Sequence, residues 1–147
     1  MTLPTVSVVI PTMNEEKSVG LVIDEVKKAF EGKRAPEVII VDTNSRDRTR
    51  EIAASLGAIV VDEPRRGYGR AYKTGFERST GETVATLDAD MTYPASDIPR
   101  LVEMLYAEDF DFITTDRFAN MEEGAMGAKH RLGNWLLSST TRLLFRV

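Results

Sequence analysis

The sequence predicts an α/β fold, built on a mostly parallel sheet with helices on both faces. Short runs rich in β-branched residues alternate with longer segments whose apolar residues recur at helical spacing. Several of the short runs are apolar at almost every position, which is typical of strands buried on both faces of a parallel sheet. Repeated units of strand and helix place helices on both sides of such a sheet.

Five segments have the composition of strands. Each is short, rich in Val, Ile, Thr or Phe, and most are followed by residues typical of turns. The first ends at Pro11, whose backbone nitrogen cannot donate a hydrogen bond to a sheet. The five expected strands cover residues 6–10, 38–41, 58–61, 83–87 and 110–114.

Four segments between them carry apolar residues three and four positions apart, which predicts helices. Ser45 is a candidate N-cap for the second helix, and Gly57 marks its C-terminal end. The four expected helices cover residues 16–30, 47–56, 68–78 and 96–106.

Length and charge limit the possible functions. The 147 residues suit one domain spanning residues 1–147. With 19 Lys and Arg against 23 Asp and Glu, the net charge of −4 argues against a nucleic-acid partner. Because the chain has no cysteine and one histidine, disulfides, thiolate catalysis and a multi-histidine metal site are excluded. No apolar run reaches the ~18 residues of a spanning helix, and a cytoplasmic protein is expected.

The segment 127–147 combines apolar residues, among them Trp135 and Leu136, with basic residues such as Arg142. Packing on the core is the commoner fate of apolar helix positions. The alternative is an interfacial helix that contacts a membrane surface. Since the pattern ends without a cap, we expect the domain to be truncated at its C-terminus.

Polar residues follow the first two expected strands. Ligands of open parallel sheets bind beyond the carboxyl ends of the strands, so these loops are candidate sites. Asn14 and Glu15 follow the first strand, although helix capping alone would explain both. Asp42 directly follows the second strand, where a carboxylate either contacts a ribose or base, or supports its own loop.

Residues 65–71, RRGYGRA, combine two glycines with a basic cluster at an expected helix start. Backbone N–H groups and arginines at such a place suit an anion, for example a diphosphate. The segment is no dinucleotide fingerprint, because the third glycine is missing and no strand leads directly into it.

Asp88 and Asp90 directly follow the fourth expected strand. In an extended segment, residues two apart point the same way, so both carboxylates would face one site. Mg²⁺ or Mn²⁺ accepts a few carboxylates and keeps positions for substrate phosphates. The alternative is a solvated acidic pair that caps the next helix.

Together, and in this order, the loops resemble those of glycosyltransferase family 2, whose members have the Rossmann-like GT-A fold. The matching segments are VSVVIPTMNE, VIIVDTNSRDRT, RRGYGRAYKTGF and TLDADMTYP. Within that family the chain looks most similar to dolichyl- or polyprenyl-phosphate mannose or glucose synthases.

The resemblance implies a metal-dependent, inverting transferase that moves a hexose from a UDP-glucose or GDP-mannose type of donor to polyprenyl or dolichyl phosphate. It implies Mg²⁺ or Mn²⁺ as cofactor and a place at the cytoplasmic membrane face. A lipid phosphate is already an anion near pH 7, so no general base is needed. The implied nucleotide-binding residues are Pro11, Asn14, Glu15, Asp42, Arg70 and Asp88; the metal ligands are Asp88 and Asp90; the catalytic residues are Asp90, Arg117 and Arg131.

Two departures from the family pattern stand in the donor loops: Met13 replaces a usual tyrosine, and Thr43 a usual second acid. Two other functions stay open, namely transfer to a glycan hydroxyl and, because the chain is expected to be incomplete, a nucleotide-sugar-binding module without turnover. A nucleotidyltransferase is disfavoured, because the loop after the first strand has no glycine.

Overall fold

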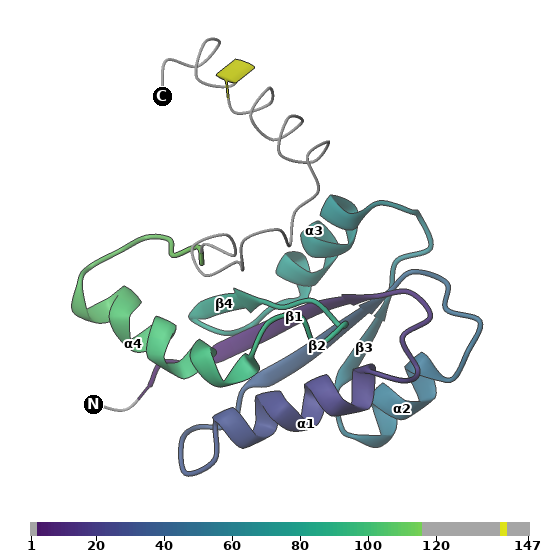
Figure 1. The fold of residues 1–147 in the computed structure, drawn as a ribbon, viewed down its shortest axis with the longest axis horizontal. Helices are drawn as coiled ribbons and strands as arrows, with labels where there is room; N and C mark the ends of the chain where they lie inside the picture. Colours follow the sequence, from purple (N-terminus) through teal and green to yellow (C-terminus); the bar gives the residue numbers. More distant parts are fainter. Residues whose placement is uncertain (1–2, 116–138, 141–147) are drawn as a thin grey trace, which may run out of the picture. The chain divides into compact units, whose positions relative to one another are not determined.

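The computed structural model of the chain describes residues 3–115, 139 and 140, and Figure 1 shows the fold. Contacts divide the chain into two units, Met1–Ile113 and Thr114–Val147. The first unit holds a four-stranded sheet in the order β3-β2-β1-β4, in which all neighbouring strands are parallel. The strands are β1 (Val6–Thr12), β2 (Glu37–Asp42), β3 (Ile59–Asp62) and β4 (Thr83–Thr86).

Helices follow each strand, as the periodicity predicts. The apolar face of the first helix is buried, and residues 16–18 before it form a turn rather than helix. The last helix begins with a short 3₁₀ turn, and Pro99 stands in its first turn, where a missing N–H costs nothing. The helices are α1 (Val19–Ala29), α2 (Thr49–Ser55), α3 (Tyr68–Arg78), η1 (Ala95–Asp97) and α4 (Ile98–Ala107).

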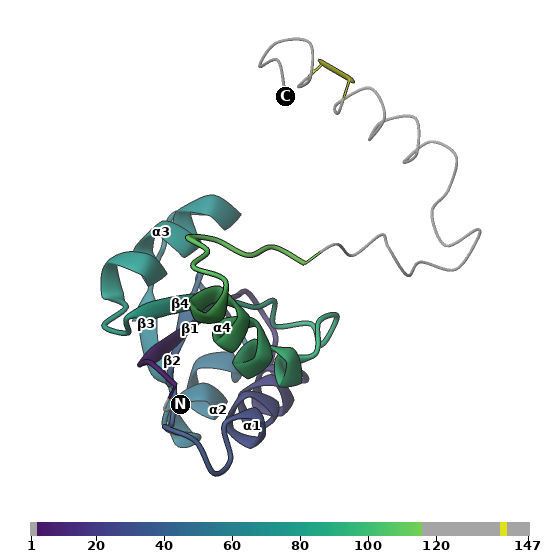
Figure 2. The same cartoon turned by 90° about the vertical axis from the view of Figure 1, so that its left-hand side faces the viewer.

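The sheet separates two cores, and Figure 2 shows helices on both of its faces. On one face, Val8 and Ile10 of β1 pack against Ile23 of α1, together with residues of α2 and α4. On the other face, Val9 packs with Ala71 of α3 and with residues of β2. Both central strands are buried along almost their whole length, so the predicted α/β class with helices on both faces is confirmed.

The fifth expected strand, residues 110–114, is wrong: the structure has no strand there. Asp109 adopts a left-handed conformation (φ 54°), and the Phe110 N–H bonds the carbonyl of Leu105 at 2.9 Å. These two features form a Schellman motif that ends α4 and turns the chain. In the described residues no strand pairs with the outer edge of β4, so Phe112 stays 79% exposed instead of entering the sheet.

The C-terminal end of α2 lies where the sequence predicts it, but the N-terminal end does not. Gly57 has φ 75°, and the Ala58 N–H bonds the carbonyl of Ala53, which is again a Schellman motif. Ser45, expected as the N-cap, lies outside the helix, which begins at Thr49. The Ser45 hydroxyl instead donates to Asp42, so this expectation is wrong. None of the helices in the described residues is long and apolar enough to cross a membrane.

Helix α3 lies unusually close to the sheet, at Gly75. A Cβ atom at this position would lie 2.3 Å from Val9 Cγ1 and 3.1 Å from Val41 Cγ2. Both valines are fully buried and cannot move away. The glycine therefore sets the distance between α3 and strands β1 and β2.

Gly75→Ala is expected to lower the free energy of unfolding by about 1–3 kcal/mol, since the added methyl overpacks the core. Gly69→Ala in the same helix is the matched control, because its Cβ meets no atom of the described residues within 4 Å. The control should be neutral or stabilising by up to about 1 kcal/mol, as helix propensity predicts. Urea unfolding measures both, and equal stabilities for the two variants would contradict the close approach.

Candidate functional site

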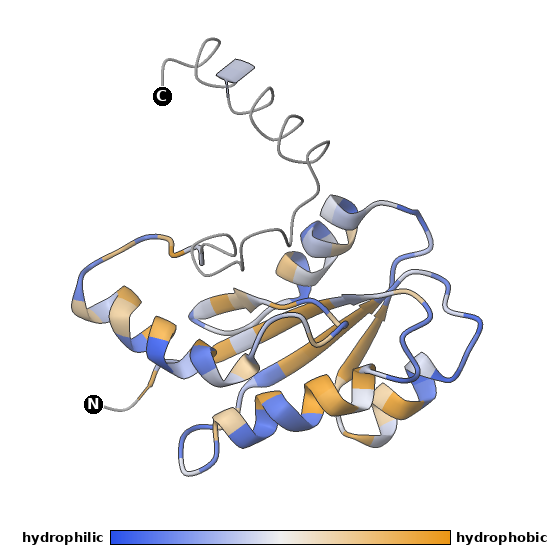
Figure 3. Cartoon of the chain, viewed as in Figure 1, coloured by the Kyte–Doolittle hydropathy of each residue, from blue (hydrophilic) through white to orange (hydrophobic). Residues whose placement is uncertain are grey.

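The candidate site lies at the carboxyl edge of the sheet. Figure 3 shows apolar strands whose ends at this edge lead into polar loops. The strand order reverses beside β1, because the chain builds β2 and β3 on one side of it and β4 on the other. Ligands of open parallel sheets bind at such a switch point. The loops after β1 and β4 therefore flank the expected binding crevice.

The loops after β1 and β2 are joined by side-chain to backbone hydrogen bonds in both directions. The Asn14 N–H donates to Ser45 Oγ at 2.8 Å, and Asn14 Oδ1 accepts from the Arg46 N–H at 2.9 Å. Four further bonds of this interlock come from residues on either side of these. They are Glu15 N to Thr49 Oγ1, Glu16 N to Asp47 Oδ2, Arg48 N to Glu16 Oε2, and the backbone bond Thr43 N to Thr12 O.

Asp42, at the end of β2, is the centre of this interlock. Its side chain is fully buried, and it accepts hydrogen bonds from the Thr12 hydroxyl and from the backbone and hydroxyl of Ser45. The Arg50 guanidinium lies 3.7 Å from Asp42 Oδ1 and 3.2 Å from Asp62 Oδ1. In this structure the carboxylate supports its own loop, which is one of the two roles that the sequence allows.

The loops after β1, β2 and β4 each have one non-glycine residue with a left-handed backbone. They are Asn14 (φ 61°), Asn44 (φ 54°) and Met91 (φ 63°). Asparagine tolerates this region better than other residues, whereas methionine is uncommon in it. Such conformations persist where the surroundings fix them, and they cluster at functional sites.

A pocket of about 590 Å³ opens between the loops after β1, β2 and β3. Its volume is within the range of small-molecule sites. Three arginines and two asparagines give it a polar and positively charged wall. The lining residues are Met13, Asn14, Asn44, Ser45, Arg46, Arg50 and Arg66.

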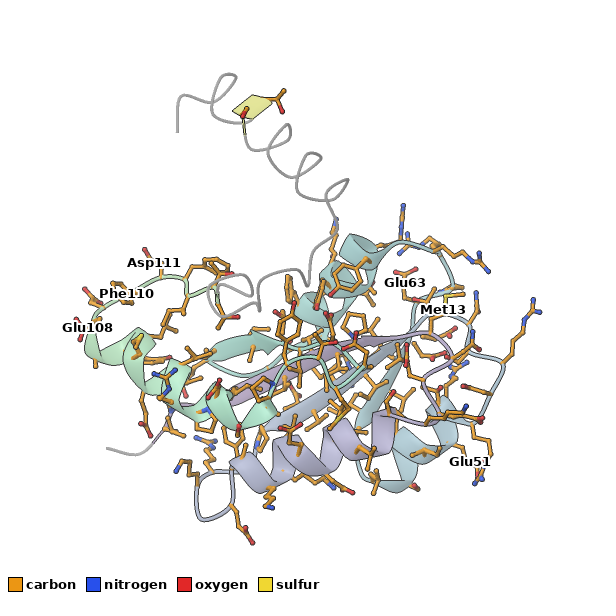
Figure 4. All side chains as sticks on the ribbon, in the orientation of Figure 1. Met13, Glu51, Glu63, Glu108, Phe110 and Asp111 are labelled. Atoms are coloured by element: carbon orange, nitrogen blue, oxygen red, sulfur yellow. The ribbon has the colours of Figure 1, made fainter. Side chains whose placement is uncertain are left out.

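Glu63 fixes the loop that leads from β3 to α3. Its side chain is buried, and the Arg65 guanidinium donates two hydrogen bonds of 2.7 Å to its two oxygens. The Thr74 hydroxyl of α3 donates a third at 2.6 Å. Arg65 and Thr74 hold the pKa of the Glu63 carboxyl well below its usual value, at about 2. Figure 4 shows Glu63 and Met13 at this end of the sheet, away from Phe110 beyond α4.

Asp88 lies after β4 and is half-buried. The hydroxyls of Tyr68 and Tyr72, one turn apart on α3, both donate to its Oδ1, the second at 3.4 Å. The two hydroxyl oxygens are 3.0 Å apart. Burial, followed by the hydrogen bond to Asp88, raises the pKa of Tyr68, so its hydroxyl stays protonated and acts as a donor.

Asp90 is exposed and lies in a turn, so the expected extended segment from Asp88 to Asp90 is wrong. Its Oδ1 accepts from the Thr92 N–H at 2.9 Å. Hydrogen bonds from the Thr92 side chain and backbone hold the pKa of the Asp90 carboxyl below its usual value. Thr92 thus supports Asp90.

The donor set suits a hard divalent cation in part. Carboxylate oxygens are the ligands that Mg²⁺ and Mn²⁺ prefer. In the described part of the chain, no group of three or more His, Cys, Asp or Glu side chains could hold a metal. Asp88 and Asp90 alone would therefore leave most coordination positions to phosphate oxygens and water, as is usual for Mg²⁺.

The other residues predicted for the site are distributed unevenly. Pro11 lies within β1, and Arg70 is exposed in the first turn of α3. Arg117 and Arg131 lie outside the described residues. Arg66, from the basic segment 65–71 singled out in the sequence, lines the pocket. Four further residues that the structure brings to this edge were not predicted individually. They are Arg50, Glu63, Tyr68 and Tyr72.

Comparison with known proteins agrees with the resemblance found in the loops. The family model for Glycosyl transferase family 2 matches residues 7–146. The chain is 39% identical over 144 residues to the low-salt glycan biosynthesis hexosyltransferase Agl6 of Haloferax volcanii, covering 97% of this chain and 35% of that protein. It is 37% identical over 144 residues to the undecaprenyl-phosphate 4-deoxy-4-formamido-L-arabinose transferase of Pseudomonas aeruginosa, covering 92% and 42%.

A solved structure of similar fold contains ligands. It is glucosyl-3-phosphoglycerate synthase from Mycobacterium tuberculosis in complex with Mn²⁺, UDP-glucose and phosphoglyceric acid. The TM-score is 0.60 at 31% identity, over 69% of this chain and 39% of that one. The chain thus spans less than half the length of the relatives it matches.

The lowered pKa of Glu63 links stability to pH. Because the folded-state pKa is about 2 against an ordinary 4.5, the ionised group stabilises the fold above pH 4.5, and this contribution is lost as the pH falls towards 2. Glu63→Gln mimics the protonated side chain. The gap in melting temperature between wild type and Glu63→Gln should therefore be widest at pH 6–7 and shrink steadily as the pH falls from about 5 to about 2.

Thermal unfolding followed by circular dichroism across this range measures the gap. Glu103→Gln, on the exposed side of α4, is the matched control and should differ from wild type by a small amount that does not depend on pH. A gap for Glu63→Gln that stays constant from pH 7 to pH 2.5 would show that Arg65 and Thr74 do not stabilise the carboxylate.

Proposed function

Because the chain belongs to glycosyltransferase family 2, we propose that it forms the donor-binding part of an enzyme that transfers a hexose from a nucleotide sugar to polyprenyl phosphate. Its parallel sheet with helices on both faces is the GT-A fold of its structural neighbours. The observation that carries the proposal is the carboxyl edge, where a polar pocket beside β1 and the acids after β4 flank the switch point.

The pocket is proposed to take the nucleotide. Arg46, Arg50 and Arg66 give it positive charge for an anionic ligand, and the amides of Asn14 and Asn44 supply both donors and acceptors. Asp42 is proposed to act indirectly: it holds Ser45 and Arg50 at the pocket wall and does not contact the nucleotide itself. Arg70, exposed at the start of α3, stays a candidate for the diphosphate.

Asp88 and Asp90 are proposed to hold Mg²⁺ or Mn²⁺ against the donor diphosphate. The bound cation would neutralise charge that develops on the departing nucleoside diphosphate. Asp90 contributes an exposed carboxylate that the Thr92 N–H holds on one oxygen, and Asp88 one that is oriented by two tyrosines. The Mycobacterium tuberculosis synthase, whose complex contains Mn²⁺ and UDP-glucose, supports this choice of cation and ligand class.

The transfer itself needs alignment more than acid–base chemistry. An oxygen of the acceptor phosphate attacks the anomeric carbon, the bond from that carbon to the diphosphate oxygen breaks, and the nucleoside diphosphate leaves with the electron pair. In-line attack of this kind inverts the anomeric centre. The protein's task is to hold the two reactants in line and to stabilise the leaving diphosphate.

The acceptor is proposed to be a polyprenyl phosphate. The undecaprenyl-phosphate transferase of Pseudomonas aeruginosa supports a polyprenyl phosphate. Arg117 and Arg131 are proposed to bind the acceptor phosphate and the donor diphosphate. A lipid acceptor would bring the protein to the cytoplasmic face of a membrane, with contact through residues 127–147 as a further part of the proposal.

A second candidate function is nucleotide-sugar binding without turnover by this chain. Thr43, which is buried where the family commonly has a second acid, favours it, because this change fits altered donor use. Transfer to a glycan hydroxyl would require a general base, and none is evident at the described edge.

Calorimetric titration with UDP-glucose and with GDP-mannose, each with and without Mn²⁺, tests the donor site. We expect one donor to bind in a metal-dependent way, and Asp90→Ala to weaken that binding at least about 10-fold, since it removes a proposed ligand. Asp24→Ala, an exposed acid on α1, is the control and should bind as wild type does.

Binding without turnover would favour the binding module, and binding with lipid-phosphate transfer would favour the enzyme. Failure of the wild-type chain to bind either donor would contradict a donor site in these residues. Metal-dependent binding that is unchanged in Asp90→Ala would contradict the role of Asp90 but not the donor site.

A further inference from the structure

Aromatic side chains on one face of α3 form a ladder that ends at Asp88. Tyr68, Tyr72 and Phe76 follow one another at intervals of four residues, so they share one face of the helix. The Tyr68 and Tyr72 rings meet edge to face with centroids 4.9 Å apart, and the Tyr72 and Phe76 rings stack at 5.8 Å. Ring contacts of this kind restrict where each hydroxyl can lie.

Tyr72 is the more firmly fixed of the two tyrosines. Its ring packs against the core between α3 and the sheet, which depends on the close approach at Gly75. Its hydroxyl lies 3.4 Å from Oδ1 of Asp88, just after β4. Tyr72 therefore joins α3 to the end of the strand that leads to Asp88. Tyr68, which follows Gly67 (φ 144°), is more exposed and completes the pair.

Both hydroxyls donate to the same oxygen of Asp88, Oδ1. Two donors on one oxygen fix the rotation of a carboxylate and lower the tendency of that oxygen to bind a cation. The second oxygen, Oδ2, would then be the one available to a cation. A carboxylate held in this way coordinates through one oxygen and resists two-oxygen coordination.

We infer that Tyr68 and Tyr72 are positioning residues that make Asp88 a one-oxygen ligand and so favour Mg²⁺ or Mn²⁺ over Ca²⁺. The inference rests on the proposed function, because it assumes that Asp88 holds the donor's cation. Mg²⁺ requires a compact octahedral site, whereas Ca²⁺ takes six to eight oxygens and readily accepts both oxygens of one carboxylate. The tyrosines thus select the cation without touching it, as outer partners of metal ligands commonly do.

The test removes only the hydroxyls. Tyr68→Phe, Tyr72→Phe and the double variant keep the ring ladder and its packing. Tyr106→Phe is the matched control, since the Tyr106 hydroxyl pairs with Thr83 at 3.0 Å, at the start of β4. Calorimetry measures the affinity for UDP alone, with Mn²⁺ and with Ca²⁺, and thermal unfolding measures the stability of each variant.

We expect the double variant to bind UDP with Mn²⁺ about 10-fold or more weakly, with its affinity for UDP alone unchanged. Its preference for Mn²⁺ over Ca²⁺ should narrow, because Oδ1 becomes free to coordinate. Tyr106→Phe should match wild type in all three titrations. A structural role would not change the ratio between the two cations.

Three results would overturn the inference. An unchanged Mn²⁺-dependent affinity in the double variant would show that the hydroxyls do not position Asp88. Equal losses with and without metal, or an unchanged preference for Mn²⁺ over Ca²⁺, would assign the tyrosines a structural role only. All three leave the proposed function intact if wild type binds UDP with Mn²⁺. A wild-type chain that shows no metal-dependent binding would instead remove the proposed donor site and this inference with it.

Discussion

The contact between Gly75 and Val9 decides how near α3 lies to the sheet, and the surroundings of two acids at the candidate site depend on that distance. Thr74, beside the glycine, reaches Glu63 at the end of β3. Tyr72, three residues earlier, reaches Asp88 after β4. A larger residue at position 75 would lift the helix and lengthen both contacts, because the fully buried valines beneath it cannot yield. One glycine in the core, Gly75, thus helps to position two separate acids at the carboxyl edge.

The acids at this edge have different roles, which their surroundings determine. Asp42 and Glu63 are buried and take several hydrogen bonds, so they hold loops in place. Asp90 is exposed and supported on one oxygen by Thr92, and Asp88 is held on one oxygen by two hydroxyls. An acid with all its oxygens occupied supports structure, whereas an acid with one oxygen held is oriented for a ligand.

The strands and helices that depend on the local sequence were predicted from its apolar patterns. Apolar runs identified β1 and β2, the spacing of Val19, Val22 and Ile23 identified α1, and the family resemblance identified the loops that meet at one edge. The strand expected at residues 110–114 failed because a strand needs a neighbour to accept its hydrogen bonds, and its own sequence does not state whether one is present. The contacts of Tyr68 and Tyr72 were not predicted, because their partner Asp88 lies twenty and sixteen residues away along the chain. The placements of Arg117 and Arg131 stay predictions.

The interlock between the loops after β1 and β2 has a consequence for how such a site can change. Each loop supplies side chains that satisfy the backbone of the other, through pairs such as Asn14 with Ser45 and Glu16 with Asp47. A replacement for one loop that lacked these side chains would leave N–H groups of the other loop without acceptors. The two loops therefore form a single structural unit, and exchanging both together is one way to change the donor preference. The other way is to substitute Arg46 or Arg66, which line the pocket and whose side chains take no part in the interlock.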